Sequence, residues 1–328
     1  MNKFKIFIPL LTVIILFNNC STDVDIYSDY KDITIVYGLL DKSDDTVWLK
    51  ITKAYQGQGD ALYFSKIPDS SNYPYKLDVT LTGIKNGEEI QTIVFDTVTI
   101  HNKLPGDSIF YFPDQLMYYA VPEQSLNEKA VYHLSIKKNN GEIKSKTSLI
   151  SDFAIVKPSG YTINFNSNGE IACNTANNGK RYEIFFTFNY RELKQGSQDT
   201  LKKSLSWKLG VVKSELTHEG YTVSIPYLGH QFYSMLDTKL EKDPYITRWT
   251  DKFKVTVACG SQDLDTYLEI NNATNNFMNE IPQFTNIEGD ATGLFASRHT
   301  MERYYKLSVR TELTLIEDYP DLGFELNP

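Results

Sequence analysis

The sequence predicts a mostly β protein built from two β-rich units, with one or two short helices in the second. Two observations support this fold class. Apolar and polar residues alternate along many short segments, as in strands that bury one face and expose the other. Strand-like and helix-like segments do not alternate regularly, which makes TIM-barrel and Rossmann architectures a poor fit.

In the first unit, the alternation predicts strands around residues 46–52, 76–82 and 132–136. Their apolar positions are Val47, Leu49 and Ile51, then Leu77, Val79 and Leu81, then Tyr132, Leu134 and Ile136. The apolar parity shifts by one between residues 93–95 and 98–100, which predicts a β-bulge at that point.

In the second unit, the same alternation predicts strands over 182–190 and 253–257. A helix is predicted over 226–240, because Leu228, Phe232, Met235, Leu236 and Leu240 recur at spacings of three and four. A shorter helix is predicted over 263–271.

Four Asn-Gly pairs lie between strand-like segments and predict local hairpins, because both residues tolerate the positive φ of two-residue turns. They are Asn86-Gly87, Asn140-Gly141, Asn168-Gly169 and Asn178-Gly179. The boundary between the units is predicted within 151–160. Residues 33–152 are long enough for one immunoglobulin-like β-sandwich, and residues 153–328 form the second β-rich domain.

The N-terminus has the pattern of a secretory leader over residues 1–19. Lys3 and Lys5 precede an apolar run that is too short to span a bilayer as a helix. Cys20 follows this run and resembles the lipidated cysteine of a bacterial lipoprotein, so we expect acyl chains there. Ordinary cleavage with an incidental Cys20 is the alternative. Residues 20–32 are acidic and predict a tether, which in Bacteroidota lipoproteins resembles the signal for export to the outer face of the outer membrane.

Composition and motifs exclude several classes of function. The formal net charge of −8 argues against a nucleic-acid partner, which would require a basic face. No motif for a catalytic residue, a metal or a cofactor is present, so none is predicted and the protein is not expected to be an enzyme. A hydrolase stays open as the least favoured alternative.

Cys173 and Cys259 both fall on the predicted core faces of their strands. An exported protein can keep a disulfide, and two buried free thiols are the alternative. Their spacing along the chain does not decide between the two.

The sequence contains 22 tyrosines and 18 phenylalanines, which can pack on sheets or contact a ligand from the surface. Tyr304 and Tyr305 are candidates for surface contact with a glycan or another polymer.

Several short segments resemble a large Bacteroidota lipoprotein family with a domain of unknown function, whose genes often lie beside those of TonB-dependent receptors. They are residues 35–41, 285–288, 293–298 and 321–324. The resemblance implies an immunoglobulin-like domain, a β-rich C-terminal domain and a place in the cell envelope. It implies no catalytic residue.

Two hypotheses of function follow from the leader and the resemblance. The first is a non-catalytic outer-membrane lipoprotein, on the cell surface or the periplasmic face, that binds a nutrient, glycan or peptide beside a TonB-dependent receptor. The second is a surface adhesive or structural module that binds glycan or host polymers through exposed aromatic residues.

Overall fold

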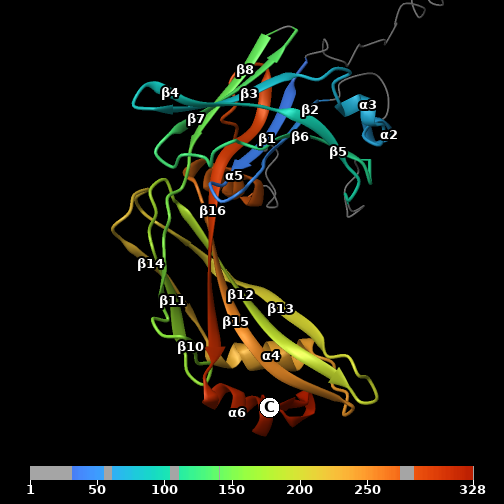
Figure 1. Ribbon diagram of the computed structural model, residues 1–328, viewed down its shortest axis with the longest axis vertical. Helices are drawn as coiled ribbons and strands as arrows, with labels where there is room; N and C mark the ends of the chain where they lie inside the picture. The colour runs from blue at the N-terminus through green and yellow to red at the C-terminus, as the bar shows by residue number, and fades with distance from the viewer. Residues whose placement is uncertain (1–31, 55–60, 104–110, 140, 274–283, 328) are drawn as a thin grey trace, which may run out of the picture.

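A computed structural model describes residues 32–54, 61–103, 111–139, 141–273 and 284–327. Half of the structure is strand and 15% is helix, which confirms the mostly β fold class. The leader, Cys20 and nearly all of the predicted tether lie outside the described residues. Two β-rich modules are stacked end to end, and one long strand runs through both (Figure 1).

The N-terminal module is a sandwich of two antiparallel sheets. Residues 291–297, from near the end of the chain, add to the edge of one of them beside β1. One sheet has the order β1-β2-β6-β5 and the other the order β4-β3-β7-β8. The strands are β1 (Thr34–Leu40), β2 (Val47–Lys53), β3 (Asp78–Lys85), β4 (Glu88–Val94), β5 (Asp96–Ile100), β6 (Gln115–Ala120), β7 (Val131–Lys138) and β8 (Gly141–Ser148).

This strand order is that of an immunoglobulin-like sandwich, with four strands in each sheet. A second hallmark agrees with it. Tyr132, near the start of β7, accepts a hydrogen bond at 2.6 Å from the backbone N–H of Asn127, as in the tyrosine corner of that fold. The predicted inward residues of β2, β3 and β7 are all buried, so the alternation identified the correct face of each strand.

Two local predictions for this module had different outcomes. Asn86 and Gly87 both have positive φ, 54° and 84°, and join β3 to β4 as predicted. The predicted bulge after residue 95 is wrong. Instead, the chain leaves one sheet after Val94 and enters the other at Asp96, with the buried Phe95 between them. The parity shift arises because Val98 points outward: it is exposed, whereas its neighbour Thr97 pairs with the buried Tyr118.

The C-terminal module is built on the longest strands. They are β12 (Arg181–Lys194), β13 (Leu201–Lys213), β15 (Ile246–Gly260) and β16 (Ala291–Leu307), in the order β13-β12-β15-β16. A three-stranded sheet, β14-β11-β9, contains β9 (Ile155–Lys157), β11 (Gly169–Asn174) and β14 (Thr222–Tyr227). Two short strands, β10 (Thr162–Ile163) and β17 (Phe324–Glu325), pair with β16 and β15.

The Asn-Gly pairs of the second unit do not form hairpins. Gly169 begins β11, and Asn178-Gly179 joins β11 to β12, which lie in different sheets. These two hairpin predictions are therefore wrong. For the Asn140-Gly141 pair of the first unit, the flanking strands β7 and β8 do pair, but Asn140 itself lies outside the described residues.

The helices are short and mostly confirm the predicted places. They are α2 (Ala61–Phe64), α3 (Pro68–Ser71), α4 (Gly229–Lys239), α5 (Gln262–Ala273), α6 (Val309–Glu317) and the 3-10 turn η1 (Pro320–Leu322). The predicted helices correspond to α4 and α5. The sequence interpretation missed α6, although Ser308 caps its N-terminus by accepting a hydrogen bond from the N–H of Thr311.

Strand β16 joins the two modules. Its first part, Ala291–Ser297, pairs in parallel with β1, and its next part, Arg298–Tyr305, pairs with β15. One sheet therefore runs through both modules (Figure 1).

The core divides into two clusters close to the predicted boundary, with Leu149 in the first and Ile150 in the second. The C-terminal segment then returns to the first cluster through Ile287 and Phe295. The N-terminal module therefore consists of residues 32–149 together with residues 284–297.

Candidate functional site

The outer face of the β1-β2-β6 sheet carries side chains that are not part of the core. Tyr37 on β1 lies opposite Lys50 on β2, and Trp48 on β2 lies opposite Tyr119 on β6. The rings of Trp48 and Tyr119 lie 5.7 Å apart. Tyr37 and Trp48 are about two-fifths exposed, so this face holds aromatic residues at the surface.

A pocket opens on this face beside α2 and α3. Its volume is about 530 Å³, within the range of small-molecule sites. The lining surface is mostly carbon, contributed in part by Ile35, Tyr37, Phe64 and the stem of Lys50. Ser65, between α2 and α3, and Ser70 and Ser71 of α3 also line it.

Several lysine side chains line this pocket. Among the described residues, Lys50, Lys53 and Lys103 line it, together with one carboxylate, that of Asp114. The Asp114 carboxylate lies 2.7 Å from Nδ1 of His101 and is therefore already engaged. The pocket is locally basic in a chain whose net charge is −8.

Two of the lysines have defined partners. Lys50 Nζ donates a hydrogen bond to Gln115 Oε1 at 3.1 Å, and Lys103 Nζ donates to the backbone carbonyl of Tyr111 at 2.7 Å. The ammonium group of Lys103 also stands 5.4 Å from the centre of the Tyr111 ring. Burial, and then the positive charge of Lys103, lower the pKa of Lys50.

Tyr37 connects the pocket to α5. Its hydroxyl lies 3.3 Å from that of Tyr267, and the two rings meet edge to face. Burial, together with this hydrogen bond, raises the pKa of Tyr37 to about 12, so the phenol stays neutral.

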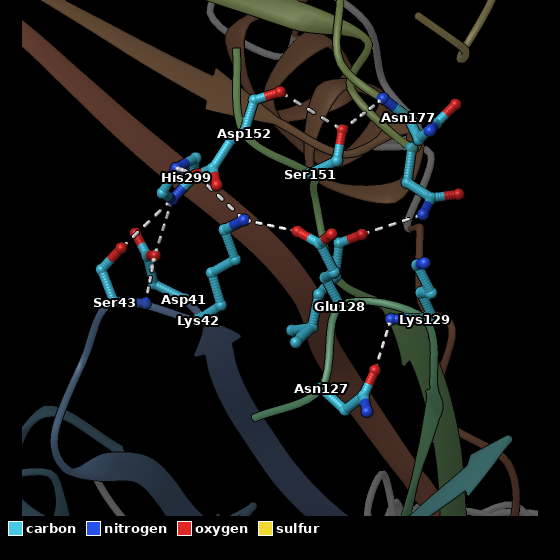
Figure 2. A network of polar contacts seen from close by, with 12 residues as sticks. Asp41, Lys42, Ser43, Asn127, Glu128, Lys129, Ser151, Asp152, Asn177 and His299 are labelled. Carbon is cyan, nitrogen blue, oxygen red and sulfur yellow. Dashed lines mark hydrogen bonds and ion pairs between the residues drawn. The ribbon is translucent and has the colours of Figure 1, made fainter. Parts of the chain in front are cut away.

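A second polar cluster lies where the two modules meet (Figure 2). His299 lies on β16, just after the point where this strand stops pairing with β1 and begins to pair with β15. Its side chain is buried, and its ring lies between two carboxylates. Nδ1 lies 3.0 Å from Asp41 of the β1–β2 loop, and Nε2 lies 3.1 Å from Asp152 of the connection between modules. The rings of Phe153 and His299 meet edge to face, with 5.9 Å between their centres.

Lys42 extends this cluster to a third segment. Its ammonium group lies 2.9 Å from Asp152 and 2.5 Å from Glu128, which precedes β7 (Figure 2). The cluster therefore holds together the β1–β2 loop, the loop before β7, the connection and β16.

The geometry of His299 suits a residue that links segments of the chain, rather than one that transfers a proton. Each ring nitrogen of His299 faces a carboxylate oxygen, and carboxylates accept hydrogen bonds. The Ser43 hydroxyl is 3.5 Å from Nδ1, the same nitrogen that faces Asp41, and in this arrangement the ring has no free nitrogen to act as a base toward it.

The pKa of the Asp41 carboxyl reflects the same contacts. Burial acts to raise it, but hydrogen bonds from His299 and from the backbone N–H of Ser43 outweigh burial and hold the pKa below its ordinary value. The pKa of Asp152 is also lowered, chiefly by the hydrogen bond from Lys42.

The residues that the sequence singled out lie elsewhere. Cys20 is outside the described residues. Cys173 and Cys259 are buried free thiols, so the disulfide alternative is wrong and the other one holds. Tyr304 is half exposed, as a contact residue requires. Tyr305 is buried and donates a hydrogen bond to the Pro158 carbonyl, so its assignment as a surface contact is wrong, because the two neighbours point to opposite faces of β16.

The sequence interpretation missed the pocket and the His299 cluster. One available signal was Trp48, an aromatic residue on the polar face of an alternating strand next to Lys50. No local pattern marks His299, since its partner Asp41 lies 258 residues away in the chain.

No protein-family model matches the chain, and no curated protein matches it either. The resemblance to the Bacteroidota lipoproteins therefore stays a prediction. Among the described helices, none has the length and apolar character needed to cross a membrane.

Proposed function

We propose that this protein is a lipid-anchored, non-catalytic component of the cell envelope. It binds a small ligand and works beside a TonB-dependent outer-membrane receptor. The observation that carries the binding role is the pocket of about 530 Å³ on the outer face of the N-terminal module. Apolar walls with a few convergent polar groups are typical of small-ligand sites.

The place of the pocket in the chain supports the envelope role. It is lined by Ile35 and Tyr37 of β1, the first described strand after the acidic segment that begins at Cys20. A lipid at Cys20 would keep this module near the membrane, where a receptor could receive the ligand. Several acyl chains are needed for a stable anchor, since each buried CH₂ contributes about 0.8 kcal/mol.

The anchor is tested by Cys20→Ala, with Cys173→Ala as the matched control. We expect radiolabelled palmitate on the wild type and on the Cys173 variant, both recovered with outer membranes. The Cys20 variant should carry no label and should leave the membrane fraction. Unlabelled wild-type protein would overturn the anchor.

The partner is tested by pulling down the tagged protein from detergent-solubilised outer membranes. We expect a TonB-dependent receptor to be recovered with the wild type. Its absence, under conditions in which the bait itself is recovered intact, would overturn the partnership. The binding role would then have to be judged on the pocket alone.

A further inference from the structure

The pocket on the outer sheet face combines a carbon-rich lining with a surplus of positive charge. We infer that it binds a small ligand with an apolar body and a single carboxylate, and that Lys50 contacts the carboxylate. This inference rests on the proposed binding function and names the class of ligand. It does not depend on the lipid anchor or on the receptor.

The apolar lining of the pocket favours a ligand whose main part is apolar. Ile35 and Phe64 face the cavity, and the exposed area of the lining is mostly carbon. A strongly polar ligand such as a free sugar would lose hydrogen bonds to water there without regaining them, whereas an apolar chain or ring gains from leaving water.

The positive charge of the lining favours a ligand that carries a carboxylate. Lys50 is partly buried, and its hydrogen-bond acceptor is the neutral amide of Gln115. Within the described residues it forms no ion pair, and the single carboxylate of the lining, Asp114, already faces His101. A partly buried ammonium group without a counter-ion is costly, so an incoming carboxylate would supply the missing charge.

The neighbouring lysines strengthen this preference. Lys53 and Lys103 line the same cavity, and the charge of Lys103 acts on Lys50 through space. Repulsion between Lys50 and Lys103 falls when an anion enters, which again favours an acid over the corresponding alcohol.

The experiment compares decanoate with decanol by titration calorimetry. They have the same chain length and differ in charge at pH 7. We expect the wild type to bind decanoate at least tenfold more tightly than decanol. Lys50→Met should weaken decanoate binding about tenfold and leave decanol binding unchanged. Lys50→Arg should retain most of the preference. The matched control is Lys137→Met, an exposed lysine of β7 in the other sheet, which should behave as wild type.

A second variant locates the ligand. Ile35→Trp places a larger side chain in the cavity and should abolish binding of both compounds, provided that its melting temperature matches that of the wild type. Decanoate binding that survives in this variant would overturn the site.

The failures of the two proposals are distinguishable. If decanol binds the wild type as tightly as decanoate, the pocket binds ligands but the anionic class is wrong. A Lys50→Met variant with unchanged decanoate affinity would also overturn the role of Lys50. If neither compound, nor a hydrophobic dipeptide whose carboxylate offers the same chemistry, binds the wild type, then both this inference and the proposed small-ligand function fail.

Discussion

The two modules have similar secondary structure but differently built interiors. The N-terminal core is mostly aliphatic, with residues such as Val36, Leu49 and Leu81 at its centre. The C-terminal core is rich in aromatic rings. Phe165 stacks on Phe232 with 4.2 Å between ring centres, and further phenylalanines and tyrosines surround the pair.

The modules also differ in where they place charge. The C-terminal module encloses an ion pair, in which Arg248 Nε lies 3.0 Å from Glu192, and both side chains are buried. The N-terminal module also holds a nearly buried lysine, Lys138, 3.1 Å from Asp32, but it places three other lysines around a pocket on its outer face. We interpret the N-terminal module as the part that presents the proposed site.

The largest expected effect tests the aromatic core. Phe232→Ala removes the ring that stacks on Phe165 and leaves a cavity. We expect it to lower the free energy of unfolding by about 3–5 kcal/mol, measured by urea denaturation. Phe112→Ala is the matched control, because Phe112 is more than half exposed. Equal losses in the two variants would contradict the view that the ring stack stabilises the C-terminal module.

A smaller effect is expected at the junction, where the modules meet. Asp41→Asn removes the buried charge that faces His299, and it should cost about 1.5–3 kcal/mol at pH 7. The pKa of Asp41 is lowered in the folded state, so its stabilisation is present above the ordinary carboxyl pKa. It is lost as the pH falls through the lowered value. The difference between wild type and variant should therefore shrink between pH 5 and pH 3.

The control for the junction is Asp96→Asn. Asp96 pairs with Lys76 at 2.7 Å, but both side chains are exposed, so we expect little change in stability at any pH. Urea unfolding at pH 7, 5 and 3 compares the three proteins. A difference between wild type and Asp41→Asn that grows on acidification would contradict the assigned direction of the pKa.

The smallest expected effect concerns the thiols of the C-terminal core. Burial raises the pKa values of Cys173 and Cys259 to about 12, so neither is a reactive thiolate at neutral pH. In a Cys20→Ala background, reductant should leave the unfolding midpoint unchanged. Iodoacetamide, followed by mass spectrometry, should label both thiols after denaturation and neither in the native protein. A midpoint that falls on reduction would indicate a disulfide and contradict the free thiols.

Local patterns predicted much of the fold. The alternation identified the buried faces of β2, β7 and β12, and the spacing of Phe232, Leu236 and Leu240 identified α4. The helix α6, nine residues long, was missed although Val309, Leu313 and Ile316 recur at spacings of four and three. The parity shift after residue 95 was assigned to a bulge, whereas it arises because the apolar Val98 lies on the outer face of β5.

The candidate sites were less predictable. The alternation placed Lys50 on an outward face, but the sequence does not reveal that α2 and α3 cover part of that face and leave a cavity. Tyr305 was expected at the surface although alternation along β16 buries it, since the strand itself was not recognised in the sequence.

The sequence by itself determined which face of each strand is buried, because the two-residue period of a strand is a local property. The sequence also drew attention to two segments, residues 35–41 and 293–298, that meet where the modules join. Only the tertiary structure decided that they meet. Residues 35–40 of β1 lie in parallel register with residues 292–297 of β16, and a Cβ on Gly38 would lie 2.3 Å from the buried Leu49 side chain, which would have to shift.

The same holds for the pocket and for His299. Their residues come from segments separated by tens to hundreds of positions, and no periodicity links them. Such contacts depend on which sheet faces pack together and on which strands become neighbours. Those choices are made by the packing of the whole chain, since the stability of each contact depends on side chains that arrive from other elements.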